Sequence, residues 1–173
     1  MKKLLLLILV VCASCAQYRF GTMLPKKYQL IAVAPVENYS NEPRLESLLR
    51  NSLAESLVQT PGVTLSAPGQ EEGLLLVTRI KELDQQRRAR ARLREHDYRD
   101  DSGSTYQTVV FQVTVRIEYE AIASDSETPY RIGEVTATAD YPMMADQETG
   151  RDEAFREAMR SAAQKIVAEV TEG

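Results

Sequence analysis

Apolar and polar residues alternate strictly along one stretch of this chain, from Val109 to Ala121. The apolar positions are Val109, Phe111, Val113, Val115, Ile117, Tyr119 and Ala121, and the polar positions are Gln112, Thr114, Arg116, Glu118 and Glu120. A repeat of two is typical of an antiparallel strand with one face in the core and the other in water or against a partner. The pattern therefore predicts a half-buried strand.

Two other stretches repeat their apolar residues every three to four positions, which is the pattern of an amphipathic helix. The first follows the candidate N-cap Asn41 and the first-turn residue Pro43, and it ends at the Thr-Pro-Gly sequence of residues 60–62. The second begins at Thr149. The apolar stripes are Leu45, Leu48, Leu49, Leu53 and Leu57 in the first, and Phe155, Ala158, Met159, Ala162, Ile166, Val167 and Val170 in the second. We expect two helices that each bury one face.

Three further stretches have the composition of strands. Residues 28–36 form a nearly continuous apolar run, as expected for a strand flanked by neighbours, although Pro35 weakens the pairing there. Residues 74–83 and 130–141 predict two more strands, and residues 63–65 could form a short edge strand. Residues 96–104 are polar and predict a turn.

The order of these elements is strand, helix, strand, strand, strand, helix. A helical crossover makes the first two strands parallel and right-handed, and the remaining strands should form a meander. We therefore expect an α+β fold of two layers, in which two helices pack on one face of a four-stranded mixed sheet. A single domain would span residues 28–173.

The N-terminus has the pattern of a secretory signal. Lys2 and Lys3 precede the aliphatic run Leu4 to Val11, which is too short to span a bilayer. The sequence Ala-Ser-Cys at residues 13–15 resembles a bacterial lipobox. We expect a signal peptide at residues 1–14, lipidation of Cys15, and a lipidated tether over residues 15–27.

A plain signal peptide, cut nearby and leaving Cys15 as a free thiol, is the alternative. Fatty acyl chains would hold the protein on the membrane through about 0.8 kcal/mol for each buried CH₂ group. Since the sequence has only two cysteines and Cys12 would leave with the signal, we expect no disulfide within the mature chain.

The charge of the chain argues against nucleic-acid binding. The formal net charge is -4, and removing Lys2 and Lys3 makes the mature chain two charges more negative. Nonspecific nucleic-acid binding depends on neutralising phosphates with Lys and Arg, so we expect no nucleic-acid partner.

Catalytic and cofactor motifs are not recognisable in the sequence. The eight glycines are scattered and do not form a phosphate-binding loop. A zinc site would need carboxylates alone, because His96 is the one histidine and Cys15 would carry lipid. His96 lies in a probable polar loop without a nucleophile in view. We therefore expect no enzyme activity, no metal and no cofactor.

One basic segment stands out in this acidic chain, from Arg87 to Arg94. If it is extended, Arg88, Arg90, Arg92 and Arg94 face one side. Arginine suits bidentate binding of phosphate or carboxylate, so these residues are candidate contacts for an anionic ligand such as a phosphorylated glycolipid. Two alternatives remain open. The segment could be a solvated hairpin arm whose charges discourage edge-to-edge pairing, or a short helix that splits the arginines between faces.

The order of motifs resembles the lipopolysaccharide-assembly lipoprotein family, LptE. The resemblance consists of the lipobox, an aromatic-glycine segment at residues 18–21, Leu-Pro at 24–25, the apolar strand ending in Pro-x-x-Asn at 31–38, the helix with Leu48, Leu49 and Leu53, a long hairpin and a closing helix. Val36 stands where the family usually has phenylalanine.

This resemblance implies a noncatalytic plug. Members of the family sit inside the outer-membrane β-barrel LptD, assist its assembly and bind lipopolysaccharide. Ala16 is not the aspartate associated with inner-membrane retention, so the resemblance also implies an outer-membrane location on the periplasmic side. A lipid-tethered periplasmic scaffold or adaptor for another envelope or secretion complex is the competing hypothesis. A lipoprotein enzyme of unfamiliar type is a third.

Overall fold

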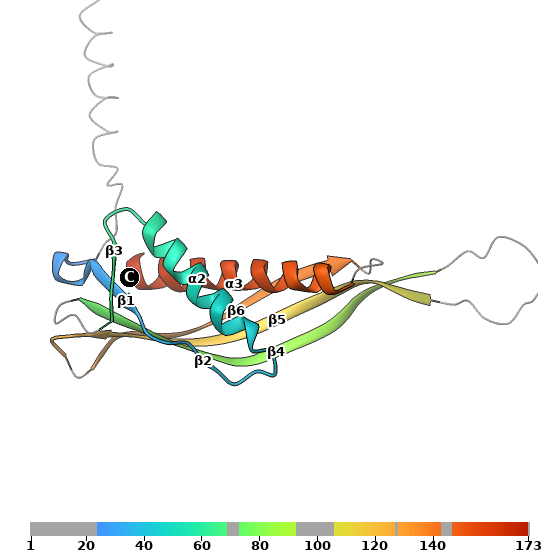
Figure 1. The fold of residues 1–173 in the computed structure, drawn as a ribbon, viewed down its shortest axis with the longest axis horizontal. Coiled ribbons are helices and arrows are strands. Elements are labelled where there is room, and N and C mark those ends of the chain that lie inside the picture. Colours follow the sequence, from blue (N-terminus) through green and yellow to red (C-terminus); the bar gives the residue numbers. More distant parts are fainter. Residues whose placement is uncertain (1–23, 69–72, 93–105, 127, 143–146, 173) are drawn as a thin grey trace, which may run out of the picture.

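The computed structural model describes residues 24–68, 73–92, 106–126, 128–142 and 147–172. Its elements, in chain order, are the 3-10 helix η1 (Lys26–Tyr28), β1 (Leu30–Val33), β2 (Glu37–Asn38), α2 (Arg44–Gln59), β3 (Thr64–Ser66), β4 (Leu74–Arg92), β5 (Tyr106–Ala123), β6 (Pro129–Pro142) and α3 (Gln147–Glu172). Figure 1 shows two layers, with α2 and α3 on the same side of a long, curved sheet.

The sheet has the order β3-β1-β4-β5-β6, and β2 pairs with β4 beside β1. β1 is parallel to both β3 and β4, whereas β4, β5 and β6 form an antiparallel meander. The predicted α+β class, the parallel first pair, the meander and the two helices on one face are confirmed.

The predicted number of four strands is wrong, because the sheet has six. One extra strand is β3, close to the proposed edge strand at residues 63–65. The other arises because the predicted strand over residues 28–36 is divided into β1 and β2. Pro35 lies between them and has no amide hydrogen for a ladder bond. Segments of two or three residues carry no readable periodicity, so composition alone could not count them.

The two central strands are much longer than the sequence pattern indicates. β4 pairs with β5 from Leu74 opposite Ala123 to Arg92 opposite Tyr106. The apolar pattern of β4 ends near Leu83, but residues 84–92 continue to pair with β5, with the exception of Arg88 at a register shift. The predicted turn at residues 96–104 lies outside the described residues.

The core lies between the helices and the meander. α2 buries four leucines, and α3 packs on β5 and β6 through alanines that allow close approach. The main buried side chains are Leu45, Leu49, Leu53 and Leu57 of α2, Phe155, Ala158, Met159, Ala162 and Ile166 of α3, and Val113, Val115 and Ile117 of β5. Each fully buried leucine contributes about 1.5–3 kcal/mol. No helix in the described part of the chain is long and apolar enough to cross a lipid bilayer.

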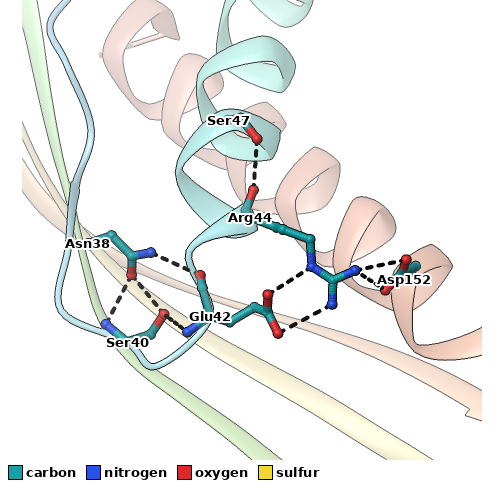
Figure 2. A network of polar contacts seen from close by, with 6 residues as sticks. All are labelled: Asn38, Ser40, Glu42, Arg44, Ser47 and Asp152. Atoms are coloured by element: carbon teal, nitrogen blue, oxygen red, sulfur yellow. Dashed lines mark hydrogen bonds and ion pairs between the residues drawn. The ribbon is translucent and has the colours of Figure 1, made fainter. Parts of the chain in front are cut away.

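The start of α2 differs from the prediction that Asn41 caps it. The N-cap position is Pro43, which has no side-chain cap. The preceding turn is instead fixed by Asn38, whose Oδ1 accepts hydrogen bonds from the Ser40 amide at 2.9 Å and the Ser40 hydroxyl at 2.7 Å. Asn38 also donates to the Glu42 carbonyl at 3.0 Å (Figure 2). The Asn38 side chain therefore shapes the turn before the helix, rather than its first turn.

Arg44, the first residue of α2, joins that helix to the second turn of α3. Its guanidinium donates to Glu42 at 2.8 Å and to both oxygens of Asp152 at 2.8 and 3.0 Å (Figure 2). Hydrogen bonding by Arg44 lowers the pKa of Glu42. These contacts set the position of the N-terminal end of α3 relative to α2.

Candidate functional site

β4 and β5 continue past the N-terminal end of α3 as a two-stranded arm (Figure 1). The pairing of β5 with β6 ends at Val110 opposite Pro142, so residues 106–109 pair with β4 alone. We use "arm" for residues 89–92 and 106–109.

A groove of about 600 Å³ opens where the arm meets α3. It is lined by Gln85, Arg87, Phe111, Tyr141, Glu148 and Arg151. The rings of Phe111 and Tyr141 lie opposite each other on β5 and β6 and are stacked, with centroids 5.3 Å apart and planes inclined by 16°. They give the groove an aromatic floor. We call it the arm groove.

A register shift in β4 places Arg87 in the arm groove. Ile80 pairs with Ile117, but Glu82 pairs with the next residue, Arg116, so Lys81 is an extra residue. Before the shift the even-numbered residues of β4 face the helices, and after it the odd-numbered residues do. Arg87 consequently lies opposite Phe111, on the helix side of the sheet.

The sequence analysis missed Arg87, because it assumed one uninterrupted alternation along the basic segment. The buried positions of β4 change from even numbers, at Leu74, Leu76 and Ile80, to the odd number of Leu83, as expected at a bulge. The sequence does not show this change, because residues 74–77 are all apolar.

Two cations, Arg87 and Arg151, line the arm groove. Neither forms an ion pair with the carboxylates among the described residues. The charge of Arg151 nevertheless contributes, after the larger effect of hydrogen bonding by Arg44, to the lowered pKa of Glu42. The Arg151 guanidinium lies 5.8 Å from the centre of the Phe155 ring. Its Nε is buried and has no hydrogen-bond partner within the described chain. Glu148 is the one acidic residue in the lining. Within the described residues, the groove therefore combines an aromatic floor with two guanidinium groups that are not in an ion pair and could bind an anion.

The predicted arginine contacts are only partly described. Arg88 is exposed on β4, next to register shifts between Arg87 and Ala89 and between Ala89 and Arg90. The backbones of Arg90 and Arg92 lie in the arm, opposite Thr108 and Tyr106. Arg94, His96 and Cys15 lie outside the described residues. A common face for the four arginines stays a prediction, since the register shifts interrupt the alternation on which it was based.

The described residues contain no group of three or more His, Cys, Asp or Glu side chains placed to hold a metal ion.

The chain is a small two-layer α+β domain with a candidate anion-binding groove at the arm. The family model described as lipopolysaccharide-assembly, LptE, matches residues 28–170. The chain therefore belongs to the LptE family, as its sequence motifs indicated. This is a family of noncatalytic components of lipopolysaccharide assembly, and membership supports a role as an envelope lipoprotein. A comparison with curated proteins gave no match.

Several solved structures resemble the chain at low sequence identity. A putative neuraminyllactose-binding hemagglutinin homolog from Helicobacter pylori has 11% identity and a TM-score of 0.51, covering 88% of this chain and 90% of its own. A putative lipoprotein from Caulobacter crescentus has 17% identity and a TM-score of 0.48, covering 79% and 87%. A minor lipoprotein from Acinetobacter baumannii has 17% identity and a TM-score of 0.43, covering 84% and 92%. The first of these likenesses shows a shared fold and nothing more.

Proposed function

We propose that this protein is a lipid-anchored component of the lipopolysaccharide-transport machinery of the outer membrane. It plugs the LptD β-barrel from the periplasmic side, assists the assembly of that barrel, and contacts lipopolysaccharide without catalysing a reaction. The observation that carries the proposal is the pair Arg87 and Arg151 at the arm groove, which have no described ion-pair partner, in a chain of the LptE family.

The chemistry of the arm groove suits a phosphorylated glycolipid. A guanidinium group binds phosphate through two parallel hydrogen bonds, and Arg87 and Arg151 both line the groove. The stacked rings of Phe111 and Tyr141 offer an apolar surface beside these donors. Because the chain as a whole is acidic, an anionic ligand is best accommodated at a basic site such as this groove.

The outer face of the sheet, turned away from the helices, suits contact with a wet protein wall. It carries a lattice of ion pairs between strands, including Arg79 with Glu120 at 2.6 Å and Arg116 with Glu134 at 3.6 Å. These ion pairs satisfy the charged groups of the face even when no partner protein is bound. It can therefore remain hydrated until it meets the lumen of a barrel.

The 3-10 helix η1 and the arm groove lie at opposite ends of the sheet. η1 follows the tether, and it is held to the turn between β5 and β6 by Lys27, which donates to Asp125 at 2.7 Å. Tyr28 donates to the same carboxylate at 3.0 Å and packs on Tyr130. Figure 1 shows η1 at one end and the arm at the other. Arg87 follows Leu74 by thirteen residues along β4, or about 40 Å, so the groove is far from the end of the domain at which η1 lies.

The experiment is a comparison of arginine variants in the mature, lipidated protein. Arg87→Gln with Arg151→Gln should reduce the affinity for purified lipopolysaccharide in detergent by about tenfold or more, because charged hydrogen bonds to phosphate are lost. Arg156→Gln with Arg160→Gln, two exposed cations of α3 outside the groove lining, is the matched control and should bind normally.

Two further measurements complete the test. The variant with Arg88, Arg90, Arg92 and Arg94 changed together to Gln asks whether the basic segment also contributes. Purification from solubilised outer membranes should recover the LptD barrel in equal amount with the unchanged protein. Unaltered lipopolysaccharide affinity in both arginine variants, or recovery of a different envelope complex, would overturn the proposal.

A further inference from the structure

β6 is the last strand of the described sheet, and it pairs on one side only, with β5. The register of this pair is continuous from Arg131 opposite Ala121 to Pro142 opposite Val110. Residues 132–140 contain neither proline nor lysine, and no bulge turns them away from solvent. Edge strands of folded proteins usually carry such features, since an unprotected edge is a template for another strand. We call residues 132–140 the free edge.

Two independent hydrogen bonds show which backbone groups of β6 point outward. The Ser124 amide donates to the Gly73 carbonyl at 3.1 Å, so even-numbered residues of β5 bond to β4 and odd-numbered residues bond to β6. The partners of those odd residues are Val135, Ala137 and Ala139. The even-numbered residues of β6 therefore direct their amide and carbonyl groups away from the sheet.

The second observation agrees with this assignment. Lys165 of α3 donates to the Thr136 carbonyl at 2.7 Å, and a helix side chain can reach that oxygen at the rim of the sheet. Among the described residues, this is the one hydrogen bond from a side chain to an outward-pointing backbone amide or carbonyl group of the free edge. Lys165 is exposed and has a flexible stem, so an incoming strand could displace its ammonium group.

The side chains beside these groups indicate what the edge would accept. Ile132 is 65% exposed, although its neighbours Gly133 and Arg131 are partly covered. Thr136 and Thr138 have the branched shape that favours strands. The remaining two outward side chains, Glu134 and Asp140, are both acidic, exposed and six residues apart. Glu134 pairs with Arg116 of β5 at 3.6 Å, and Asp140 accepts a hydrogen bond from Gln112 at 2.8 Å. A carboxylate has further lone pairs, so each can also accept from a cation beside the free edge. A strand laid beside the free edge would place one residue opposite each of them.

We propose that the free edge of β6 binds an extended segment of a partner protein by strand addition, with basic residues of that segment opposite Glu134 and Asp140 and an apolar residue beside Ile132. Main-chain hydrogen bonds would supply the affinity, and the alternate side chains would supply the specificity. This inference goes beyond the proposed function, because it uses neither the arm groove nor lipopolysaccharide.

A second copy of the chain is a poorer occupant than a basic segment. In antiparallel self-pairing, registers that bring Glu134 opposite Glu134 or opposite Asp140 place like charges directly across from each other, which destabilises a strand pair. A sedimentation profile showing a dimer whose formation is abolished by changes in the free edge would overturn the assignment of a basic partner.

The test uses two synthetic peptides and the full mature protein. Both peptides alternate valine and threonine; one carries lysines at two positions six residues apart, and the other carries glutamates there. The lysine peptide should bind about tenfold more tightly by fluorescence anisotropy. It should slow amide hydrogen exchange at Glu134, Thr136, Thr138 and Asp140 and leave the odd-numbered amides unchanged. Equal affinity, or protection on another strand, would contradict the proposal.

Two variants distinguish binding by backbone hydrogen bonds to β6 from binding by charge attraction alone. Thr138→Pro removes an amide hydrogen that points only outward, so the pairing with β5 is retained and peptide binding should be lost. Thr138→Ala keeps the amide and is the matched control. If the proline variant does not fold, Glu134→Lys with Asp140→Lys serves instead, and the preference should change to the glutamate peptide. An unchanged preference would overturn the inference while leaving the proposed function of the arm groove intact.

Discussion

The ring of Tyr119 lies directly against the backbone of Gly133, the residue opposite it on β6. A Cβ atom at position 133 would lie 2.5 Å from the Tyr119 hydroxyl and 2.6 Å from two ring carbons. The hydroxyl in turn donates to Glu169 of α3. One buried tyrosine thus ties β5, β6 and α3 together, and it can do so only because the facing residue has no side chain.

Gly133→Ala should destabilise the protein by about 1–3 kcal/mol, because the added methyl group overlaps a ring that is 1% exposed and cannot move aside. Urea unfolding measures the effect. Gly150→Ala is the control, since the nearest atom to a Cβ there is 3.6 Å away. That change should be neutral or slightly stabilising, because alanine favours a helix over glycine. Equal effects at the two glycines would contradict the close contact.

The stability of the protein should fall between about pH 10 and pH 12. Burial, followed by the hydrogen bond to Glu169, raises the pKa of Tyr119 from 10.0 to about 12. The unfolded chain loses this proton at lower pH than the folded one does. The contribution is therefore fully present below pH 10 and is lost as the pH rises through the folded pKa.

Urea unfolding at several pH values can isolate this contribution. Tyr119→Phe should remove the part of the stability loss at alkaline pH that ionisation of Tyr119 causes. Tyr39→Phe, at a side chain that is 65% exposed, should leave the decline as it is. A decline that is identical in all three proteins would exclude Tyr119 as its origin.

Thr78→Val should stabilise the protein by about 1 kcal/mol. Thr78 is completely buried on β4, and its hydroxyl has no hydrogen-bond partner within the described chain. Valine has nearly the same shape and removes the desolvation cost of an unsatisfied hydroxyl. Thermal unfolding measures the gain, and Thr138→Val on the exposed face of β6 is the control. A loss of stability would show that the Thr78 hydroxyl is bonded in solution.

Asp125→Asn should release η1 from the turn between β5 and β6. Hydrogen bonds from Lys27 and then from Tyr28 lower the pKa of Asp125 below its ordinary value of 3.8. Their contribution to stability is present above that value and is lost as the pH falls. Trypsin should therefore cut faster after Lys26 and Lys27 in the variant at neutral pH. Asp140→Asn is the control. Unchanged cleavage would mean that other contacts hold η1.

Cys15→Ser should move the protein from the membrane to the soluble periplasmic fraction, because acylation needs the cysteine sulfur and no other anchor is proposed. Fractionation followed by mass spectrometry of the mature N-terminus measures the change. Retention of the variant at the membrane would show that another segment or a partner holds it there.

Much of the architecture could be predicted from local pattern. The alternation in β5 and the leucine stripe of α2 each require one face to be buried, and a helix between two strands favours a parallel pair. The lipobox and the strand before the first helix were sufficient to indicate the family. The short strands β2 and β3 were harder to predict. A segment of two or three residues is too short to show a repeating pattern, and it becomes a strand only because a neighbouring strand pairs with it.

The candidate site was mostly a consequence of tertiary structure. The sequence gathered Arg88, Arg90, Arg92 and Arg94 into one group, whereas the arm groove takes Arg87 from β4 and Arg151 from α3. Nothing local could bring these two together. Their positions depend on the extra residue Lys81 in β4 and on the ion pair between Arg44 and Asp152 in the second turn of α3.

Sequence by itself determined the longer strands and the helices and the faces that they bury. Hydrophobic burial requires apolar residues to repeat with the period of the element, and this period is visible in the sequence. Tertiary structure decided the register of β4 on β5, the pairing of Tyr119 with Gly133, and the free edge of β6. These depend on contacts between residues far apart in the chain, and a shift of one residue reverses the face on which a side chain lies.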